Sequence, residues 1–370
     1  MISKFGLRDF KGHRDTQLVL GRFTMLVGDN ASGKTSVLDA LALQPGLGSA
    51  PAAVLRGSSS PKDILRRTSQ GPIVFASEGI DRDLGWSATF MLHQIPKDSD
   101  LVKKSWHLAI ASTIGGISLV AEAPTELVSM SRDWQRAWES IAAPLGTARV
   151  YRWRAERIAA SAYSDQPGAL IETDGTNTAV VLAAMKLGDD EVFNRVEDAL
   201  RKLIPSIERL RLRPATVRRR SPNAGSVVGT KIYFDFRGAS AVPAHGASHG
   251  TLIVLALLAV LHGAKRPNLI LLDDLDHALH PRAQIELMRM IKNLLALDEF
   301  KDVQVVATTH SPYVLDELDP SDVYAFALRD DGTVASKRLS EHPEAERTRG
   351  ALKSGQLWSL DPERDWVLGG

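Results

Sequence analysis

The octapeptide Gly28-Asp29-Asn30-Ala31-Ser32-Gly33-Lys34-Thr35 constrains the fold more than any other stretch of this chain. It fits the pattern G-x-x-x-x-G-K-[ST], and it lies between an apolar run that ends at Val27 and a helical pattern that begins at Lys34. The two glycines let successive backbone N–H groups turn inward, and the helix start adds further N–H groups. The sequence therefore predicts a phosphate-binding loop between a buried strand and a helix.

The chemistry of such a loop assigns a role to each position. Lys34 places a cation against the β- and γ-phosphates and is also a candidate catalytic residue, and Thr35 offers its hydroxyl to Mg²⁺. ATP and Mg²⁺ are the cofactors that this motif predicts. The alternative is a chance Gly/Lys turn at a helix start, which the flanking strand and helix disfavour. The residues we expect to contact the nucleotide are Asn30, Ala31, Ser32, Gly33, Lys34, Thr35 and Ser36.

Two acids follow the short apolar run Leu269–Leu272. A run of this kind is typical of a buried strand in a parallel sheet. In phosphoryl-transfer enzymes, an aspartate at such a strand end holds magnesium, and we assign that role to Asp273. We assign activation of the attacking water to Asp274. The alternative interpretation is a pair of solvated acids in a turn.

A histidine follows a third apolar strand. The run Val303–Thr308 leads into Thr309-His310-Ser311-Pro312. In a P-loop fold this strand lies beside the strand of the phosphate loop, so His310 is expected to sense the γ-phosphate through a hydrogen bond. The alternative is a structural histidine, because a lone histidine more often satisfies only its own surroundings.

The remaining pattern predicts an α/β architecture. The second half of the chain alternates helices and strands, which is typical of a parallel sheet with helices on its faces. Residues 44–72 are rich in glycine and proline and are expected to form a loop-rich insertion. Neither an internal repeat nor a long heptad pattern is present. The expected helices are Lys34–Leu43, Thr125–Ala142, Thr178–Lys186, Asp190–Leu203, Thr251–Leu261 and Pro281–Leu297. The strands before the loop and the runs Leu269–Leu272 and Val303–Thr308 are given above. The other expected strands are Pro72–Ala76, Trp86–His93, Ser105–Ala111, Gly116–Ala121, Ile207–Arg213, Val227–Phe236 and Tyr324–Leu328.

Composition narrows the classes of protein further. The 370 residues carry a net charge of +1, which argues against a protein that coats nucleic acid by bulk charge. The absence of cysteine excludes disulfides, thiolate metal sites and cysteine nucleophiles. The N-terminus lacks the pattern of a signal peptide, and the longest apolar run, Leu252–Leu261, is about half the roughly 20 residues that span a bilayer. We therefore expect a cytoplasmic protein that does not act in a membrane.

The order of these motifs resembles the ABC-type ATPases of the SMC/RecF class. More narrowly it is similar to the stand-alone AAA15/AAA21-type ATPases, which include the ATPase part of OLD-family proteins. Asp276–Pro281 resembles their E-x-x-L-H-P stretch, and Ala247–Leu252 resembles their signature S-D/S-G-T-L. Thr173–Asn177, followed by a helix, also looks like a recurrent stretch of these proteins. The resemblance implies an α/β P-loop NTPase head of ABC type, with a mixed or antiparallel β subdomain, a helical subdomain and no coiled-coil arms.

The resemblance also implies a mechanism. Two heads would pair as a homodimer that sandwiches two ATP molecules, and hydrolysis would release the dimer. Ser248, His249 and Gly250 of one subunit would cap the γ-phosphate held by the other. Ala278, Leu279 and His280 would form a loop that crosses the interface. A glutamine that helps to hold magnesium is expected as well, with Gln70, Gln94 and Gln135 as the candidates.

Two residues depart from the family pattern. Asp274 stands where glutamate is usual, and its side chain is one methylene shorter. A misplacement of about 1 Å can cost on the order of 100-fold in rate, so we expect slow hydrolysis. His249 stands where an acid or serine is usual, and it either adds positive charge beside the γ-phosphate or fills space.

Two basic stretches are candidate contacts for nucleic acid. The first is either a contact for DNA phosphates or a solvated strand edge. The second is basic and aromatic, and it either stacks on a base or on adenine, or packs along a helix, which we favour. These stretches consist of Arg209, Arg211, Arg213, Arg218, Arg219 and Arg220, and of Tyr151, Arg152, Trp153, Arg154 and Arg157.

The resemblance implies a dimeric, ATP-dependent switch in DNA repair or anti-phage defence, with defence slightly favoured. The switch would control DNA or a separate effector protein, because the roughly 40 residues after position 330 are too few for a second catalytic domain. The alternative is a nucleotide-binding scaffold with negligible turnover, and a small-molecule kinase is a weaker third. The expected parts are residues 1–145 and 241–330 as the two halves of the head, 146–240 as a middle subdomain and 331–370 as a tail.

Overall fold

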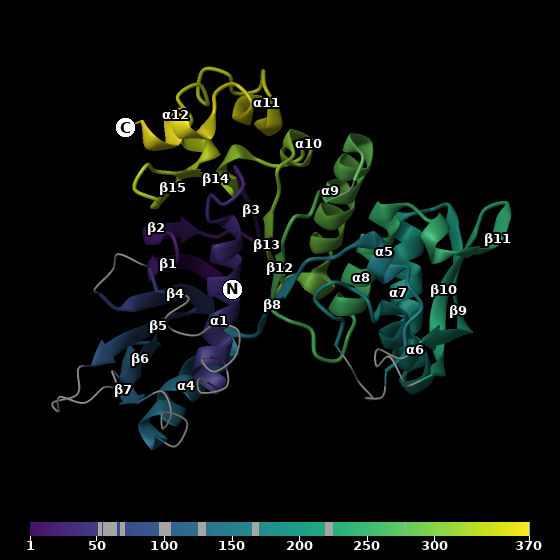
Figure 1. Cartoon of the computed structure of the whole chain (residues 1–370), viewed down its shortest axis with the longest axis horizontal. Helices are drawn as coiled ribbons and strands as arrows, with labels where there is room; N and C mark the ends of the chain where they lie inside the picture. The colour runs from purple at the N-terminus through teal and green to yellow at the C-terminus, as the bar shows by residue number, and fades with distance from the viewer. Residues whose placement is uncertain are drawn as a thin grey trace. The chain divides into compact units, whose positions relative to one another are not determined.

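The computed structural model describes residues 1–50, 54, 65–66, 71–95, 105–124, 131–164, 170–218, 225–277 and 279–369 (Figure 1). The chain forms two compact units. Unit 1 comprises residues 1–150, 268–271 and 302–370, and unit 2 comprises residues 151–267 and 272–301. The expected division into four consecutive parts stays a prediction.

Unit 1 contains a six-stranded antiparallel sheet in the order β2-β1-β4-β5-β6-β7. Apolar side chains on one face, such as Phe5, Phe75 and Phe90, are fully buried. They share one core with residues of helices α1 and α4. The sequence alternation predicted these strands, and the structure confirms them. Their bounds are β1 Ile2–Phe10, β2 His13–Val19, β4 Ile73–Asp81, β5 Leu84–Ile95, β6 Ser105–Ile114 and β7 Ile117–Pro124, and the helices are α1 Lys34–Ser49 and α4 Arg132–Leu145.

Helix α1 is longer than the sequence predicted. It continues past Leu43 through Pro45 and ends at Ser49, so residues 44–49 are helical and not part of a loop. The reason is tertiary packing, which outweighs the low helix propensity of proline and glycine. The carbonyl of Gly48 accepts a hydrogen bond of 2.9 Å from the indole Nε1 of Trp134, and a Cβ on Gly48 would lie 2.0 Å from the ring of Trp138. Most of the remaining insertion lies outside the described residues.

A second sheet of unit 1 carries the phosphate-loop strand at its centre. Its order is β15-β14-β3-β13-β12-β8, and β3 pairs in parallel with both β13 and β14. The edge strand β15 is antiparallel to β14, and neither β15 nor β8 was predicted. These two sheets confirm the expected α/β head with an antiparallel subdomain. The strands are β3 Phe23–Gly28, β8 Ala148–Tyr151, β12 Leu269–Leu272, β13 Gln304–Thr308, β14 Val323–Leu328 and β15 Val334–Arg338.

The tail of unit 1 packs against this sheet. Helix α10 (Pro312–Leu315) follows β13, and the short helices α11 (Ser354–Trp358) and α12 (Glu363–Leu368) come last. Helix α12 packs on β14 and β15, and Trp366 is buried. The Lys337 ammonium on β15 donates a hydrogen bond of 2.9 Å to the carbonyl of Trp366. The tail is therefore an integral part of unit 1.

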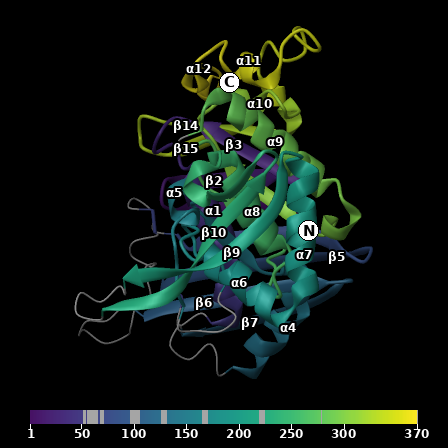
Figure 2. The ribbon, with the colours of Figure 1, turned by 90° about the vertical axis from the view of Figure 1, so that its right-hand side faces the viewer.

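Unit 2 is built around the apolar helix α8, which is buried from Gly250 to Leu261. A three-stranded sheet in the order β11-β10-β9 forms the other layer, and its long β9–β10 ribbon is visible in Figure 2. Helix α7 has the predicted bounds. Among the described helices, none is both long and apolar enough to cross a bilayer. The elements are α5 Ala155–Ile158, α6 Thr178–Gly188, α7 Asp190–Leu203, β9 Ile207–Arg218, β10 Ser226–Phe236, β11 Ala239–Pro243, α8 His249–Leu261 and α9 Pro281–Leu295.

One buried amide joins the two sheets of unit 1. The Gln304 side chain at the start of β13 donates to the carbonyls of Ile2 (2.7 Å) and Gly21 (2.8 Å) and accepts from the N–H of Ile2 (3.0 Å). Gln304 is 2% exposed, so water cannot replace these bonds.

We therefore expect Gln304→Leu to lower the free energy of unfolding by about 3 kcal/mol, because it leaves buried backbone groups of Ile2 without partners. The matched change Gln17→Leu on the exposed surface of β2 is expected to alter it by less than about 0.5 kcal/mol. Chemical denaturation of both variants measures the difference. Equal effects would contradict the role of Gln304.

Candidate nucleotide-binding site

The phosphate loop has the backbone conformation that an anion site requires. Gly28, Ala31 and Gly33 all have positive φ angles, of 137°, 63° and 100°. The loop is closed by a hydrogen bond of 3.2 Å from the N–H of Ser32 to the carbonyl of Asp29. Alternation of left- and right-handed residues turns successive N–H groups toward one side of the chain. The first turn of the 16-residue helix α1 adds its own N–H groups to that side.

Close contacts, in addition to the positive φ angles, favour glycine at positions 28 and 33 of the loop. A Cβ on Gly28 would lie 2.3 Å from the carbonyl oxygen of Phe326 on β14. A Cβ on Gly33 would lie 2.8 Å from both His13 Nε2 and Val334 Cγ2. A side chain at position 28 would clash with the backbone of β14, and one at position 33 would displace the side chains of His13 and Val334. The spacing of the motif therefore follows from the packing of β3 between its neighbours.

Lys34 lies inside the loop. Its side chain is 5% exposed, and its ammonium donates hydrogen bonds of 2.8 Å to the carbonyls of Gly28 and Asp29. This holds a positive charge within the curl of the loop, where the motif places the β- and γ-phosphates. Thr35 is exposed on the first turn of α1, and Ser36 follows it half-buried. Asn30 and Ala31 are exposed at the tip of the loop.

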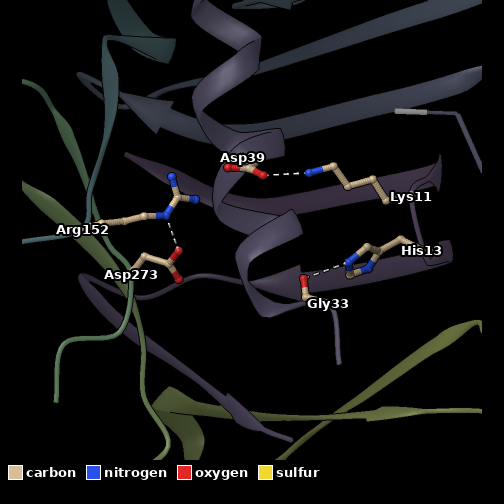
Figure 3. Close-up of polar contacts among 6 residues, drawn as sticks. All are labelled: Lys11, His13, Gly33, Asp39, Arg152 and Asp273. Carbon is tan, nitrogen blue, oxygen red and sulfur yellow. Dashed lines mark hydrogen bonds and ion pairs between the residues drawn. The ribbon is translucent and has the colours of Figure 1, made fainter. Parts of the chain in front are cut away.

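His13 and Lys11 fix the loop to the antiparallel sheet, which the sequence did not reveal. His13 Nε2 lies 3.1 Å from the carbonyl oxygen of Gly33 (Figure 3). His13 Nδ1 lies 2.9 Å from Thr16 Oγ1. The Lys11 ammonium forms a 2.8 Å ion pair with Asp39 on α1 (Figure 3). Burial lowers the pKa of His13 to about 4, with a smaller lowering by the Lys11 charge opposed by the bond to Gly33. The imidazole is therefore neutral at pH 7.

His310 reaches the same sheet edge as the loop. Strand β13 runs parallel to β3 with Thr308 opposite Leu26, so both strands end at one edge. The N–H of Thr309 donates to the carbonyl of Leu26 at 3.1 Å, and Thr309 is fully buried. His310 is exposed at this edge, directly before the start of α10. Within unit 1, the structure thus brings together the phosphate loop and the predicted sensor histidine.

Unit 2 carries the predicted magnesium ligand. Asp273 directly follows the last residue of β12 and is 5% exposed. Its carboxylate forms an ion pair of 2.8 Å with the Arg152 guanidinium (Figure 3). The N–H of Asp273 bonds to the carbonyl of Tyr151, and the N–H of Arg152 bonds to the carbonyl of Thr173, each at 2.8 Å. The Thr173–Asn177 stretch is therefore a tight turn that positions Arg152. The pairing of Arg152 with Asp273 was not foreseen.

Asp274 occupies a strained backbone position. Its φ is 53°, and its side chain is exposed. Its carbonyl accepts from the N–H of His277 at 3.0 Å, which closes a turn. Leu279 is buried and His280 caps α9 by accepting from the N–H of Arg282. Ala278 of the predicted interface loop lies outside the described residues.

The predicted signature forms the start of α8. The helix begins at His249, two residues earlier than expected, and the Ser248 hydroxyl caps it by accepting a bond of 3.1 Å from the N–H of Thr251. His249 is half-buried with Nε2 3.9 Å from a Glu156 carboxylate oxygen, and Gly250 is buried. Ser248 is exposed at the start of α8, and its hydroxyl oxygen also lies 2.8 Å from Thr251 Oγ1.

The basic stretches divide into paired and exposed residues. Arg211 on β9 is neutralised by Asp235, and this contact lowers the pKa of that carboxyl. The guanidinium of Arg213 stacks 5.0 Å from the Tyr233 ring, while Arg209 is exposed. Arg219 and Arg220 lie outside the described residues. Tyr151 and Trp153 are buried against each other, so they pack within unit 2 instead of presenting a stacking surface.

The predicted glutamine remains unassigned. Gln70 and the Gln94 side chain lie outside the described part of the chain. Gln135 is described on α4 of unit 1. Apart from this glutamine, the predicted site residues of unit 1 lie at the carboxyl edge of the β3 sheet or on α1. The roles of all site residues stay predictions.

Three comparisons with known proteins found similarities. The profile of a family described as "AAA domain, putative AbiEii toxin, Type IV TA system" matches residues 131–316, just over half of the chain. The Septu protein PtuA of Bacillus thuringiensis is 34% identical over 71 residues, which are 19% of this chain and only 17% of that protein. The SMC head domain from Thermotoga maritima superimposes over 91% of this chain and 98% of its own, with a TM-score of 0.49 and 13% identity.

His13 generates a prediction about pH. The unfolded chain protonates His13 below its ordinary pKa of 6.5, whereas the folded protein does so only near pH 4. The folded state therefore loses stability as the pH falls from 6.5 to 4, by up to about 3 kcal/mol. The variant His13→Gln retains a hydrogen-bonding amide. Between pH 7 and pH 4.5, we expect its free energy of unfolding to fall by about 2 kcal/mol less than that of wild type.

Chemical denaturation at several pH values measures this difference. Burial also lowers the pKa values of His262 and His342, but both residues are present in either protein, so their effects cancel in the comparison. Parallel stability curves for wild type and His13→Gln would show that His13 is not the titrating group.

Proposed function

The chain belongs to the family of AAA domains described as putative AbiEii toxins of a type IV toxin–antitoxin system, and from that premise we propose that it is an ATPase. The observation that carries the proposal is the phosphate loop, in which three positive φ angles, the buried Lys34 ammonium and the start of α1 converge. These are the features that bind the phosphates of a nucleoside triphosphate. Lys34 would neutralise charge on the transferred phosphoryl group.

Magnesium fits the residues that we assign to it. The Thr35 hydroxyl and the Asp273 carboxylate are the oxygen ligands that Mg²⁺ prefers. In NTPase sites the ion is held by one or two protein groups together with phosphates, and it neutralises phosphate charge. Arg152 would orient the Asp273 carboxylate through the 2.8 Å ion pair. This role makes Arg152 a positioning residue.

Asp274 would activate the attacking water. Its φ of 53° lies in a region that aspartate and asparagine tolerate better than other residues with side chains. This preference gives a physical reason for aspartate at a position where glutamate is usual. The exposed carboxylate can accept a proton from water, but its shorter reach supports slow turnover. His310 would contact the γ-phosphate from the edge of the β3 sheet.

We further infer that two subunits share each ATP. Ser248, His249 and Gly250 of one subunit would cap the γ-phosphate bound in the phosphate loop of the other. The support is the start of α8, where an exposed serine precedes the first turn of a long buried helix. ATP would hold this homodimer together, and loss of the γ-phosphate would release it. The homodimer is the bistable element of the proposed switch.

The switch would act on a partner. The family description names a toxin–antitoxin system, which consists of at least two components and supports a separate partner protein. We propose anti-phage defence, in preference to DNA repair, as the setting and the cytoplasm as the location. DNA is a second candidate partner, supported by the exposed Arg209 and the Arg213–Tyr233 pair on the β9–β10 ribbon. The alternative function, a nucleotide-held scaffold without turnover, is supported by the short Asp274 side chain.

The first test compares ATP hydrolysis by wild type, Lys34→Ala and Asp274→Asn, with the mass of each measured in solution with and without ATP. We expect slow turnover by wild type and none by Lys34→Ala, which loses the loop cation. Asp274→Asn keeps the backbone preference at this position but lacks the carboxylate, so it should bind ATP, remain dimeric and hydrolyse at least about 100-fold more slowly.

The same assay with added duplex DNA tests the DNA candidate, because a DNA-responsive switch changes its rate when DNA is present. If wild type binds ATP and dimerises but never turns over, and Asp274→Asn behaves identically, the scaffold is the correct function and the role of Asp274 is wrong. If Lys34→Ala hydrolyses ATP as fast as wild type, the loop assignment itself fails.

A further inference from the structure

Unit 2 contains a cavity of about 590 Å³ that none of the steps proposed above uses. It lies between α6, α7 and the end of α8. Most of its lining is apolar, including Ile171, Val181, Met185 and Val260. Its volume falls within the range of small-molecule sites, roughly 300–1,000 Å³.

The cavity opens to solvent. Ala184, Gly188, Ala264 and Lys265 all line it and are exposed. A Cβ on Gly188 would meet nothing within 4 Å, which shows the space at this mouth. A ligand can therefore enter without unfolding the helices.

Two cations line the cavity without a partner. Neither Arg195 on α7 nor Lys265 after α8 forms an ion pair or hydrogen bond with any described residue. The one acid among the described lining residues is Asp189, and its carboxylate caps α7 by accepting from the N–H groups of Glu191 (3.0 Å) and Val192 (3.3 Å). The described lining residues therefore carry two positive charges and one negative charge, which leaves an excess of one positive charge.

His262 adds a polar group to the lining. Its Nε2 is buried and has no hydrogen-bond partner among the described residues. Its ring packs edge-on against Phe300, and burial lowers its pKa, so the ring is neutral at pH 7. A buried nitrogen of this kind is costly to leave unsatisfied.

We propose that this cavity binds a small amphipathic carboxylate, with an apolar body among the side chains of α6, α7 and α8 and a head that meets Arg195 and Lys265. The ends of α6 and α8 also border the cavity, and helix C-termini carry partial negative charge. A singly charged carboxylate therefore fits better than a doubly charged phosphate.

The cavity and the predicted signature share one rigid element. Helix α8 begins with His249 and Gly250 and ends beside the cavity at Val260 and His262, about 20 Å away for a helix of its length. A bound carboxylate is thus placed to act on the start of α8. This regulatory consequence rests on the proposed function, whereas the binding itself does not.

The test is calorimetric titration of the whole chain with octanoate, decanoate, dodecanoate and naphthoate, with 1-decanol as the uncharged control. We expect at least one of the carboxylates to bind with a one-to-one stoichiometry, and decanol to bind about tenfold more weakly than decanoate. Arg195→Met and Lys265→Met keep much of the apolar stem and should each weaken binding about tenfold. Ala184→Trp should block the mouth and abolish binding.

Lys202→Met, at an exposed position of α7 outside the lining, is the matched control and should bind like wild type. Lys34→Ala should also bind like wild type, which separates this site from the nucleotide site. The proposal is overturned if no carboxylate binds with a dissociation constant below the millimolar range. It is equally overturned if Arg195→Met, Lys265→Met and Ala184→Trp, each with a wild-type circular dichroism spectrum, bind as tightly as wild type.

Discussion

The close approach of backbone at Gly28 and Gly33 is the constraint on which the rest of unit 1 depends. Gly28 lies against the carbonyl of Phe326, and Gly33 lies against His13 and Val334, so strands β14, β2 and β15 all press on the loop. Both residues have positive φ, which only glycine adopts cheaply. The two sheets therefore meet at the phosphate loop, and packing holds its shape.

Much of this arrangement could be predicted from local pattern. Helix α7 and strand β12 have the predicted bounds, because Asp189 caps the helix through its side chain and the strand is apolar throughout. The positions after β3 and β13 share one sheet edge because the two strands are parallel. The profile match and the two sheets confirm the expected family and fold.

The remaining features depend on contacts between distant residues, which periodicity does not encode. Helix α1 continues through Pro45 because Trp134 and Trp138 pack on its last turn. Arg152 looked like part of a basic surface, yet it pairs with Asp273, 121 positions away. His13 carried no motif, although it contacts the loop directly. These residues act through tertiary packing, so no local sequence signal could have found them.

The central claim is that one active site is assembled from two subunits, and complementation between variants tests it most directly. Lys34→Ala removes the loop cation, while Ser248→Asp keeps the α8 cap but sets a negative charge against the γ-phosphate. Each variant alone should be inactive. Mixed in equal amounts, they should recover about a quarter of the wild-type rate, because half of the dimers then contain one intact composite site. A mixture that remains as inactive as its components would contradict the shared site.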